Sequence, residues 1–217
     1  MFELFYNFYG INQKLFLFIN NLTNSKITIA QILYLSSYPF GISKFAIYYV
    51  IGVVIAYYRI KNIKSSTNRL ARFWQLYQLF TKIGIIYTFF GCTYAALKFS
   101  INLPRPFCSL TTETFFTITD TQSYRCLSSF PSAHVGLAVM ISYIFWRYTN
   151  VIGKACLIIL TTTVAISRLS LAVHYPADIL YSLIIIILVI ICGNKISYLL
   201  KNNILFRIGS VISQAVM

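Results

Sequence analysis

Residues 177–194, ADILYSLIIIILVIICGN, form an apolar run in which the one charged side chain, Asp178, stands near the beginning. A helix needs about 20 mostly apolar residues to cross the hydrocarbon core of a bilayer. Similar apolar stretches occur at 42–59, 75–97, 133–148 and 153–172. The sequence therefore predicts an all-α fold, a polytopic transmembrane helical bundle with five strong spans.

A weaker run near the N-terminus, residues 27–40, contains Gln31, two serines and Pro39. It is either a tilted sixth span that continues to about Phe45 or a helix in the membrane interface, and we favour the span. The 217 residues are 58% hydrophobic and only 10% charged, whereas soluble domains have about 25% charged residues. We expect a single membrane domain over residues 1–217.

The net charge of +14 comes from 18 basic and 4 acidic residues. The basic residues lie between apolar runs instead of on one soluble surface, so we expect no nucleic-acid partner. Basic residues of short loops mark the cytoplasmic side, which places residues 98–132 and 168–177 on the opposite side. The bias toward Ile, Asn, Lys and Phe favours a bacterial inner membrane, with that opposite side facing the periplasm. The three basic segments contain Arg59 to Arg72, then Arg147 and Lys154, then Lys195, Lys201 and Arg207.

Three polar clusters stand at the predicted non-cytoplasmic ends of the spans: KFSINLPRP at 98–106, PSAH at 131–134 and SRLSLAVHYPAD at 167–178. The 40 residues from His134 to His174 allow one span down, a turn and one span back. Both imidazoles are therefore expected on the same face as Lys98, Arg105 and Arg168. Such a cluster of cations costs several kcal/mol of repulsion and desolvation unless an anion joins it. A tetrahedral oxyanion suits the forked arginine donors.

The spacing also suggests chemical roles. If residues 174–178 are helical, His174 and Asp178 share a face, and a carboxylate on one ring nitrogen leaves the other as a nucleophile or base. His134 follows Pro-Ser-Ala at the start of an apolar helix, where free N–H groups and the helix dipole favour phosphate oxygens. One imidazole would attack and the other would protonate the leaving group.

The three clusters resemble the Lys-x6-Arg-Pro, Pro-Ser-Gly-His and Ser-Arg-x5-His-x3-Asp motifs of the type 2 phosphatidic acid phosphatase family of integral-membrane lipid phosphate phosphatases. The resemblance covers residues 98–178 and implies a metal-independent phosphohydrolase without a cofactor, in a bundle of typically six spans. By this analogy His174 forms a phosphohistidine, Asp178 orients it and His134 is the general acid. The phosphate would be held by Lys98, Arg105, Ser132 and Arg168.

Two positions near the motifs are less defined. Ala133 replaces the glycine of the family motif, and its methyl group is tolerable unless the backbone needs a positive φ. Ser167 either contacts the phosphate or packs helices. Two histidines and one carboxylate could form a three-ligand zinc site, but the surrounding cations would repel a dication. We expect no metal.

Two of the five cysteines, Cys108 and Cys126, lie in the 98–132 segment. A disulfide is reasonable if that segment faces an oxidising periplasm, and two free thiols are the alternative. Cys92, Cys156 and Cys192 lie in predicted spans and are expected to pack there.

The sequence thus predicts a lipid phosphate phosphatase that acts on a phosphate monoester or pyrophosphate at the non-cytoplasmic face, with a membrane lipid phosphate as its partner. A phosphotransferase with an alcohol acceptor and a non-catalytic lipid-phosphate binder or transporter are the alternatives. The sequence does not select among four candidate substrates: phosphatidic acid, phosphatidylglycerophosphate, undecaprenyl pyrophosphate and a lipid A phosphate. It does not give the oligomeric state either.

Overall fold

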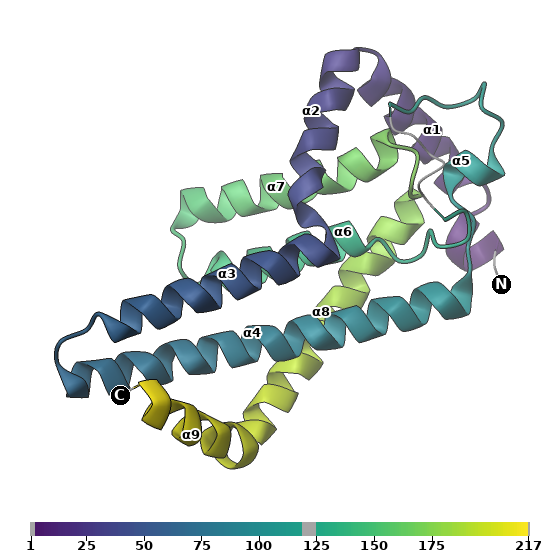
Figure 1. Cartoon of the computed structure of the whole chain (residues 1–217). Helices are drawn as coiled ribbons and strands as arrows, with labels where there is room; N and C mark the ends of the chain where they lie inside the picture. The colour runs from purple at the N-terminus through teal and green to yellow at the C-terminus, as the bar shows by residue number, and fades with distance from the viewer. Residues whose placement is uncertain (1–2, 119–124, 217) are drawn as a thin grey trace. The chain divides into compact units, whose positions relative to one another are not determined.

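The computed structural model of the chain describes residues 3–118 and 125–216, and the regular structure in them is helical (Figure 1). A short π-helix η1 (Glu3–Asn7) comes first, and a 3₁₀ turn η2 (Tyr38–Phe40) joins the second and third helices. The α-helices are α1 (Ile11–Asn24), α2 (Ile27–Ser37), α3 (Ile42–Lys61), α4 (Ser66–Ile101), α5 (Pro106–Ser109), α6 (Ala133–Trp146), α7 (Val151–Ser170), α8 (Pro176–Leu200) and, after the π-helical turn η4 (Lys201–Leu205), α9 (Phe206–Val216).

Four helical stretches are long and apolar enough to cross a membrane: Ile42–Lys61, Ser66–Ile101, Val151–Ser170 and Pro176–Gln214. They correspond to four of the five strong spans that the sequence predicts. The fifth, α6, is apolar but has 14 residues, about 21 Å at 1.5 Å per residue. Helix α2 has 11 residues and ends at the Pro39-containing turn η2. The structure supports a membrane protein, and it does not confirm five or six spans.

Helix ends differ from the apolar runs for identifiable reasons. Helix α4 extends the predicted 75–97 run in both directions, because polar and basic side chains such as those of residues 68–72 continue a helix without difficulty. Helix α7 instead ends at Ser170, short of residue 172. Ala172 has a left-handed φ of 53°, a conformation that stops a right-handed helix.

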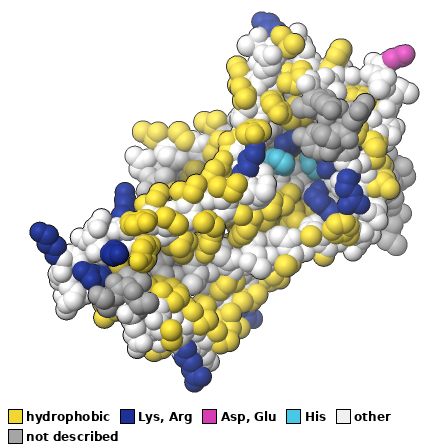
Figure 2. All heavy atoms as spheres, in the orientation of Figure 1, with side chains coloured by type: hydrophobic (Ala, Val, Ile, Leu, Met, Phe, Trp, Pro, Cys, Tyr) yellow, Lys and Arg dark blue, Asp and Glu magenta, His cyan; other side chains and the backbone are white. Residues whose placement is uncertain are grey.

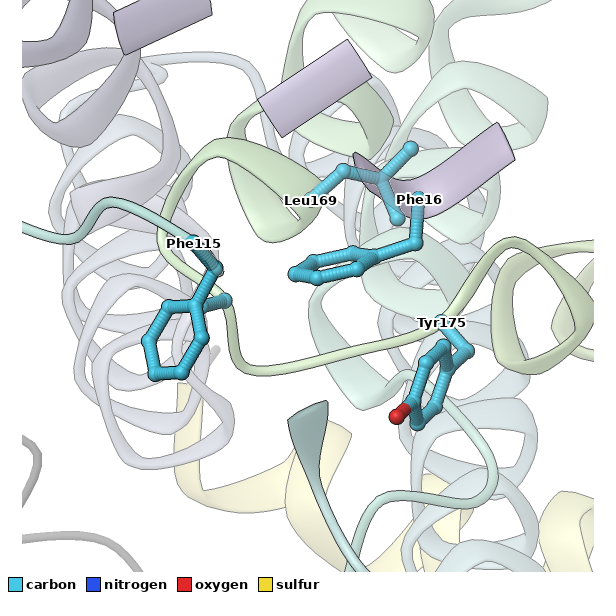
Figure 3. Packing of buried hydrophobic residues seen from close by; sticks show 5 residues of the cluster. Phe16, Phe115, Leu169 and Tyr175 are labelled. Carbon is cyan, nitrogen blue, oxygen red and sulfur yellow. The ribbon is translucent and has the colours of Figure 1, made fainter. Parts of the chain in front are cut away.

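The chain divides into two compact units, and the first comprises Met1–Ile42 and Thr93–Ile186. Helix α7 lies at its centre, because α1, α2 and α6 all pack against it. One buried cluster joins Val135 and Ala138 of α6 to Val164 of α7 and to Phe40. A second gathers Phe16, Phe115, Leu169, Ala172 and Tyr175 around the C-terminal end of α7 (Figure 3).

Asn20 of α1 satisfies polar groups at that end of α7. The last carbonyls of a helix have no partner within it, and the buried Asn20 amide donates to the carbonyls of Leu169 at 3.1 Å and Ser170 at 3.0 Å. Its oxygen accepts from the N–H of Phe116 at 2.8 Å. Helix α1 therefore holds both the end of α7 and the long segment that follows α5.

The second unit comprises Ser43–Cys92 and Ile187–Met217. Close helix packing inside it depends on Gly193, where an added Cβ would lie 2.8 Å from Cγ1 of Ile86. Helix α9 packs through Phe206, whose ring stacks on Trp74 of α4 at 5.3 Å between centroids. Every polar residue that the sequence analysis assigned to the phosphate site belongs to the first unit.

Candidate active site

The first unit brings the three polar clusters of the sequence together. Lys98 lies near the end of α4, Arg105 immediately before α5, His134 at the start of α6 and Arg168 near the end of α7. The charges of Lys98, Arg105 and Arg168 act on the imidazoles of both His134 and His174. Figure 2 shows the cyan histidine atoms beside dark blue basic side chains. The convergence that span alternation predicted is present.

His174 and Asp178 form the buried centre of this cluster. Nδ1 of His174 lies 3.5 Å from Oδ2 of Asp178, and the two side chains are 4% and 0% exposed. They do not share a helical face, since His174 precedes α8, which begins at Pro176. Instead, Asp178 lies in the first turn of α8 and accepts from the N–H of Tyr175 at 2.8 Å. The pair meets through a helix cap instead of through i,i+4 helical spacing.

Two further residues hold the Asp178 carboxylate, and sequence reasoning missed both. The Ser129 hydroxyl donates to Oδ2 at 2.5 Å, and the Tyr6 hydroxyl donates to Oδ1 at 2.7 Å. Ser129 stands close to the 131–134 motif and could have been suspected from that position. Tyr6 comes from the N-terminal π-helix η1, and no spacing pattern links it to the motifs.

The turn between α7 and α8 presents His174 to the site. The N–H of Leu171 donates to the Ser167 carbonyl at 3.0 Å, and the N–H of Val173 donates to the Arg168 carbonyl at 3.3 Å. With Ala172 in the left-handed region, the chain reverses over a few residues. This tight turn keeps His174 beside Arg168 although α7 has ended.

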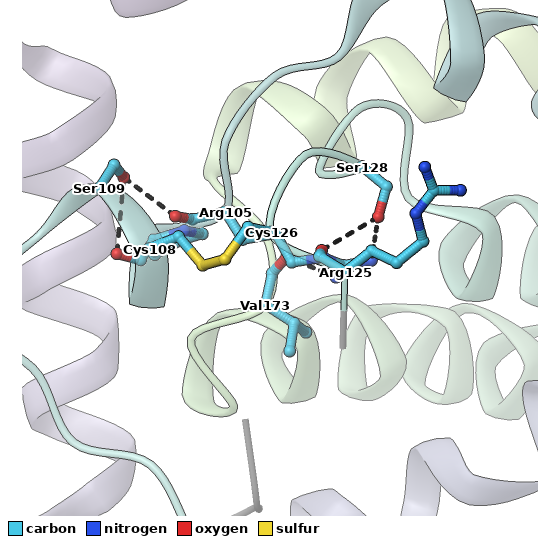
Figure 4. The surroundings of a disulfide bond; sticks show 8 residues. Arg105, Cys108, Ser109, Arg125, Cys126, Ser128 and Val173 are labelled. Carbon is cyan, nitrogen blue, oxygen red and sulfur yellow. Dashed lines mark hydrogen bonds between the residues drawn. A yellow bond between two sulfur atoms is a disulfide. The ribbon is translucent and has the colours of Figure 1, made fainter. Parts of the chain in front are cut away.

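Arg105 is a buried cation held by three loop groups (Figure 4). Its Nε donates to the Arg125 carbonyl at 2.9 Å, one Nη to the Val173 carbonyl at 2.9 Å and the other to Oγ of Ser128 at 3.1 Å. These bonds tie the segment before α5 to the turn that carries His174. They also fix the plane of the guanidinium, which suits recognition of a multi-oxygen anion.

A disulfide between Cys108 and Cys126 closes the segment around Arg105. The N–H of Arg105 donates to the Cys126 carbonyl at 2.9 Å, so one of the two bridged cysteines is also hydrogen-bonded to the backbone of Arg105. Three cysteines have free thiols: Cys92, Cys156 and Cys192. The disulfide therefore restrains the segment at Arg125 and Cys126, whose carbonyls accept from the guanidinium and from the backbone N–H of Arg105 respectively.

The other two cations are fixed from different elements. Nζ of Lys98 donates to the Ser128 carbonyl at 2.8 Å. The guanidinium of Arg168 is buried, and one Nη lies 3.4 Å from the Ser37 hydroxyl at the end of α2. Positive charge thus reaches the site from α4, from the segment before α5 and from α7.

The start of α6 provides donors of a different kind. Ser132 is its N-cap residue, but its side chain does not cap the helix, and its buried hydroxyl has no hydrogen-bond partner among the described residues. The first N–H groups of a helix have no acceptor within it, and they carry the positive end of the helix dipole. A buried hydroxyl beside such N–H groups is suited to an anionic oxygen.

Ala133 and Ser167 can now be placed. Ala133 is the first residue of α6 and is absent from the positive-φ positions, so its methyl group causes no left-handed strain. Ser167 is fully buried and donates to the Val164 carbonyl of its own helix at 2.8 Å. That bond is typical of a serine that packs between helices.

Burial and cationic neighbours control the protonation of His174. Burial is the larger cause, followed by the charges of Arg105, Lys98 and Arg168, and together they lower the pKa of His174 well below its ordinary value. The imidazole is therefore neutral at neutral pH, which a nitrogen nucleophile requires. Within residues 3–118 and 125–216, no group of three or more His, Cys, Asp or Glu side chains is arranged to hold a metal ion.

A family model described as the PAP2 superfamily matches residues 79–201, more than half of the chain. The chain belongs to the PAP2 superfamily. This membership confirms the resemblance carried by the three clusters, all of which lie inside the matched residues, and it supports a lipid phosphatase.

The crystal structure of Aquifex aeolicus LpxE has the same fold as this PAP2 chain. The TM-score is 0.60 at 19% sequence identity, and the match covers 85% of this chain and 95% of LpxE. No curated protein sequence matches the chain.

Proposed function

We propose that this PAP2 protein hydrolyses a lipid-linked phosphate monoester or pyrophosphate at the periplasmic face of a bacterial inner membrane, through a phosphohistidine on His174. The observation that carries the proposal is the neutral, buried imidazole of His174, placed between the Asp178 carboxylate at 3.5 Å and three cations. A site built only for binding phosphate needs the cations but not this oriented imidazole.

In the first step, Nε2 of His174 attacks phosphorus and the bond from phosphorus to the leaving oxygen breaks. Nδ1 keeps its proton and faces Oδ2 of Asp178, which stabilises the positive charge that develops on the ring. Burial and the neighbouring cations lower the pKa of His134 in the free protein. A bound phosphate dianion offsets those cations, so that His134 binds a proton in the complex and gives it to the leaving oxygen as general acid. The products are a phosphohistidine and the dephosphorylated lipid, or the lipid monophosphate if the substrate is a pyrophosphate.

In the second step, water attacks the phosphorus of the phosphohistidine. The neutral His134 accepts a proton from this water, the N–P bond breaks, and inorganic phosphate leaves. Negative charge on the phosphoryl oxygens is stabilised by Lys98, Arg105, Arg168 and the N–H groups at the start of α6, with the Ser132 hydroxyl as a further donor. Both residues then return to their starting protonation states.

The charge balance of the site favours a mechanism without a metal. Three cations already supply the positive charge that a divalent ion supplies in other phosphatases, and Asp178 is fully engaged by Ser129, Tyr6 and Tyr175. Hard divalent cations need several carboxylate or carbonyl oxygens. A dication placed among Lys98, Arg105 and Arg168 would be repelled.

The test is phosphate release by the purified protein from phosphatidic acid, phosphatidylglycerophosphate, undecaprenyl pyrophosphate and a lipid A phosphate, beside water-soluble phosphate esters. A substrate whose chain remains in the bilayer gains about 0.8 kcal/mol per buried CH₂, so lipid phosphates should be strongly preferred. We expect the first three lipids to react faster than lipid A phosphate, whose saccharide headgroup needs more surface. Equal rates on soluble esters would contradict access from the membrane.

The same assay separates the alternative activities. A phosphotransferase would produce a new phosphodiester with an added alcohol in place of free phosphate, and a non-catalytic binder would bind the lipid without turnover. Product analysis by mass spectrometry distinguishes the three outcomes.

Orientation is tested by reporter fusions in a bacterial host. A reporter that is active only outside the cytoplasm should be active when inserted within 110–118 and silent when inserted at 62–65, the connection between α3 and α4. The reverse pattern would place the candidate site in the cytoplasm.

A further inference from the structure

Tyr6 makes a contact to the centre of the site that the proposed mechanism does not use. It belongs to η1 (Glu3–Asn7), and its hydroxyl donates to Oδ1 of Asp178 at 2.7 Å across 172 residues of sequence. Both residues lie in the first compact unit. A buried carboxylate accepts hydrogen bonds from any nearby donor. The hydrogen bonds to both oxygens of Asp178 must therefore be compared to decide whether the bond from Tyr6 also orients the carboxylate.

The two oxygens of Asp178 have different surroundings. Oδ2 accepts from the Ser129 hydroxyl and from the N–H of Tyr175, and it is the oxygen that faces Nδ1 of His174. Oδ1 accepts from Tyr6. A planar carboxylate bonded at both oxygens by different elements cannot rotate without breaking a bond. Tyr6 therefore holds the carboxylate plane in the orientation that directs Oδ2 at His174.

The Tyr6 ring is itself fixed in place. It makes edge-on contacts with Tyr175 at 6.4 Å and Phe130 at 6.5 Å between ring centroids. The Tyr181 hydroxyl of α8 donates to the Phe5 carbonyl in the same short segment. Burial and then the Asp178 charge raise the pKa of Tyr6, so its hydroxyl keeps the proton that it donates.

We propose that Tyr6 is a positioning residue for catalysis, acting through Asp178 to orient the imidazole of His174. The inference rests on the proposed function, because the orientation matters only if His174 reacts. Tyr6 touches neither the reacting phosphate nor the water in this scheme.

This role predicts a change in the pH profile. The hydrogen bond from Tyr6 favours the ionised form of Asp178. Removal of the Tyr6 hydroxyl should therefore make the Asp178 and His174 pair easier to protonate, and the acidic limb of kcat/KM should move to higher pH. The other titratable or charged groups near His174 come from every element around it: Lys98 of α4, Arg105 before α5, His134 of α6, Arg168 of α7, Tyr175 of the turn and Asp178 of α8.

The experiment compares Tyr6→Phe with two controls that carry the same change. Tyr9→Phe removes the hydroxyl of an exposed tyrosine after the same segment. Tyr181→Phe removes the hydrogen bond to the Phe5 carbonyl of the same segment without touching Asp178. In Tyr6→Phe the phenyl ring that remains would keep the aromatic contacts. For each full-length variant, kcat, KM and the pH profile of kcat/KM are measured on the lipid phosphate that the wild type hydrolyses fastest.

We expect Tyr6→Phe to lower kcat roughly tenfold to a hundredfold, as loss of a hydrogen bond to a charged group does, and to shift the acidic limb upward. KM should change little, because ground-state contacts to the phosphate are intact. Both controls should resemble the wild type. Wild-type kinetics in Tyr6→Phe would overturn the role, and so would equal losses in Tyr6→Phe and Tyr181→Phe without a shift of the acidic limb.

Failure of the proposed function looks different. It would appear as an inactive wild type on every lipid phosphate, or as full activity in His174→Ala, both with Tyr6 intact. Either result would remove the reaction, and with it the role of Tyr6.

Discussion

Asp178 reaches His174 from the first turn of α8, whereas His174 lies outside that helix in the turn before Pro176, with 3.5 Å between Oδ2 and Nδ1. The carboxylate is fixed by the same backbone N–H that it caps, and the imidazole is fixed by a reversal of the chain. The orientation of the pair therefore depends on the turn of residues 171–175 more than on helical spacing.

The first prediction concerns the two imidazoles. His174→Ala should abolish phosphate release, because the proposed reaction passes through a bond between phosphorus and the His174 imidazole. His134→Ala should lower kcat by about 10² to 10⁴ with poor leaving groups, the usual contribution of a general acid, and by less with good ones. Rates over a series of phosphate esters of graded leaving-group pKa check this. A loss independent of the leaving group would contradict the acid role of His134.

The second prediction concerns pH. Burial and three cations lower the pKa of His174, so the neutral imidazole persists as the pH falls below the ordinary histidine value of about 6.5. The acidic limb of kcat/KM, which reports the free enzyme, should therefore have its midpoint below about pH 6.5. Arg105→Gln removes one of the cations and should move that midpoint upward. A wild-type midpoint above the ordinary value would contradict the neutral state of His174.

The third prediction concerns metals and inhibitors. Activity should persist after dialysis against EDTA, because Lys98, Arg105 and Arg168 supply the positive charge at the phosphate. Vanadate should inhibit, since it adopts the five-coordinate geometry of the phosphoryl transition state. Complete loss in EDTA with recovery on addition of one divalent metal would show that the cations alone do not suffice.

The fourth prediction concerns the disulfide. The Cys108 to Cys126 bridge has a sequence separation of 18, and in the chain-entropy model a loop of this size is worth roughly 3 kcal/mol. Cys108→Ser should lower thermal stability and raise KM, because the carbonyls of Arg125 and Cys126 that orient Arg105 lose their restraint. Cys92→Ser is the matched control. Mass spectrometry of non-reduced protein from the native membrane should find the bridge, and two free thiols there would contradict it.

The fifth prediction concerns the alanine that replaces the motif glycine. Because Ala133 begins α6 without a positive φ, Ala133→Gly should leave kcat within about twofold and lower stability by up to about 1 kcal/mol. Steady-state kinetics and thermal inactivation check both parts. A large rise in kcat would mean that the methyl group obstructs the phosphate.

The meeting of the three clusters could be predicted because alternation of spans puts every second connection on the same side. Apolar runs predicted both ends of α3 and α7 and the start of α8 within two residues, because hydropathy depends on neighbouring residues only, whereas α8 ends at Leu200, six residues beyond the predicted run. The exact end of α7 was not predictable, because no sequence signal marks the left-handed φ of Ala172, which is buried with Phe16 and Tyr175. The predicted run at 133–148 is itself shorter than the roughly 20 residues that a span needs, and α6 ends two residues earlier, at Trp146.

The side chains that donate hydrogen bonds to Asp178 could not be predicted from the sequence. Ser129 and Tyr6 are ordinary residues without a characteristic spacing, and their contacts form only when distant segments pack. The same holds for Asn20, whose amide completes the end of α7. In a single sequence, nothing in the polar residues of the N-terminal segment links them to the candidate site.

The contact between Tyr6 and Asp178 also sets an order of assembly. At 5 to 20 residues per second, the ribosome takes roughly 9 to 34 s to synthesise the 172 residues that separate them. During that interval Tyr6 of η1 lacks its acceptor, the Asp178 carboxylate, and Asn12 of α1 lacks its donor, the backbone N–H of Ala177 in α8. Contacts between such distant residues form slowly. The N-terminal segment therefore makes these contacts only after the start of α8 has been synthesised, so the candidate site is completed late in biogenesis.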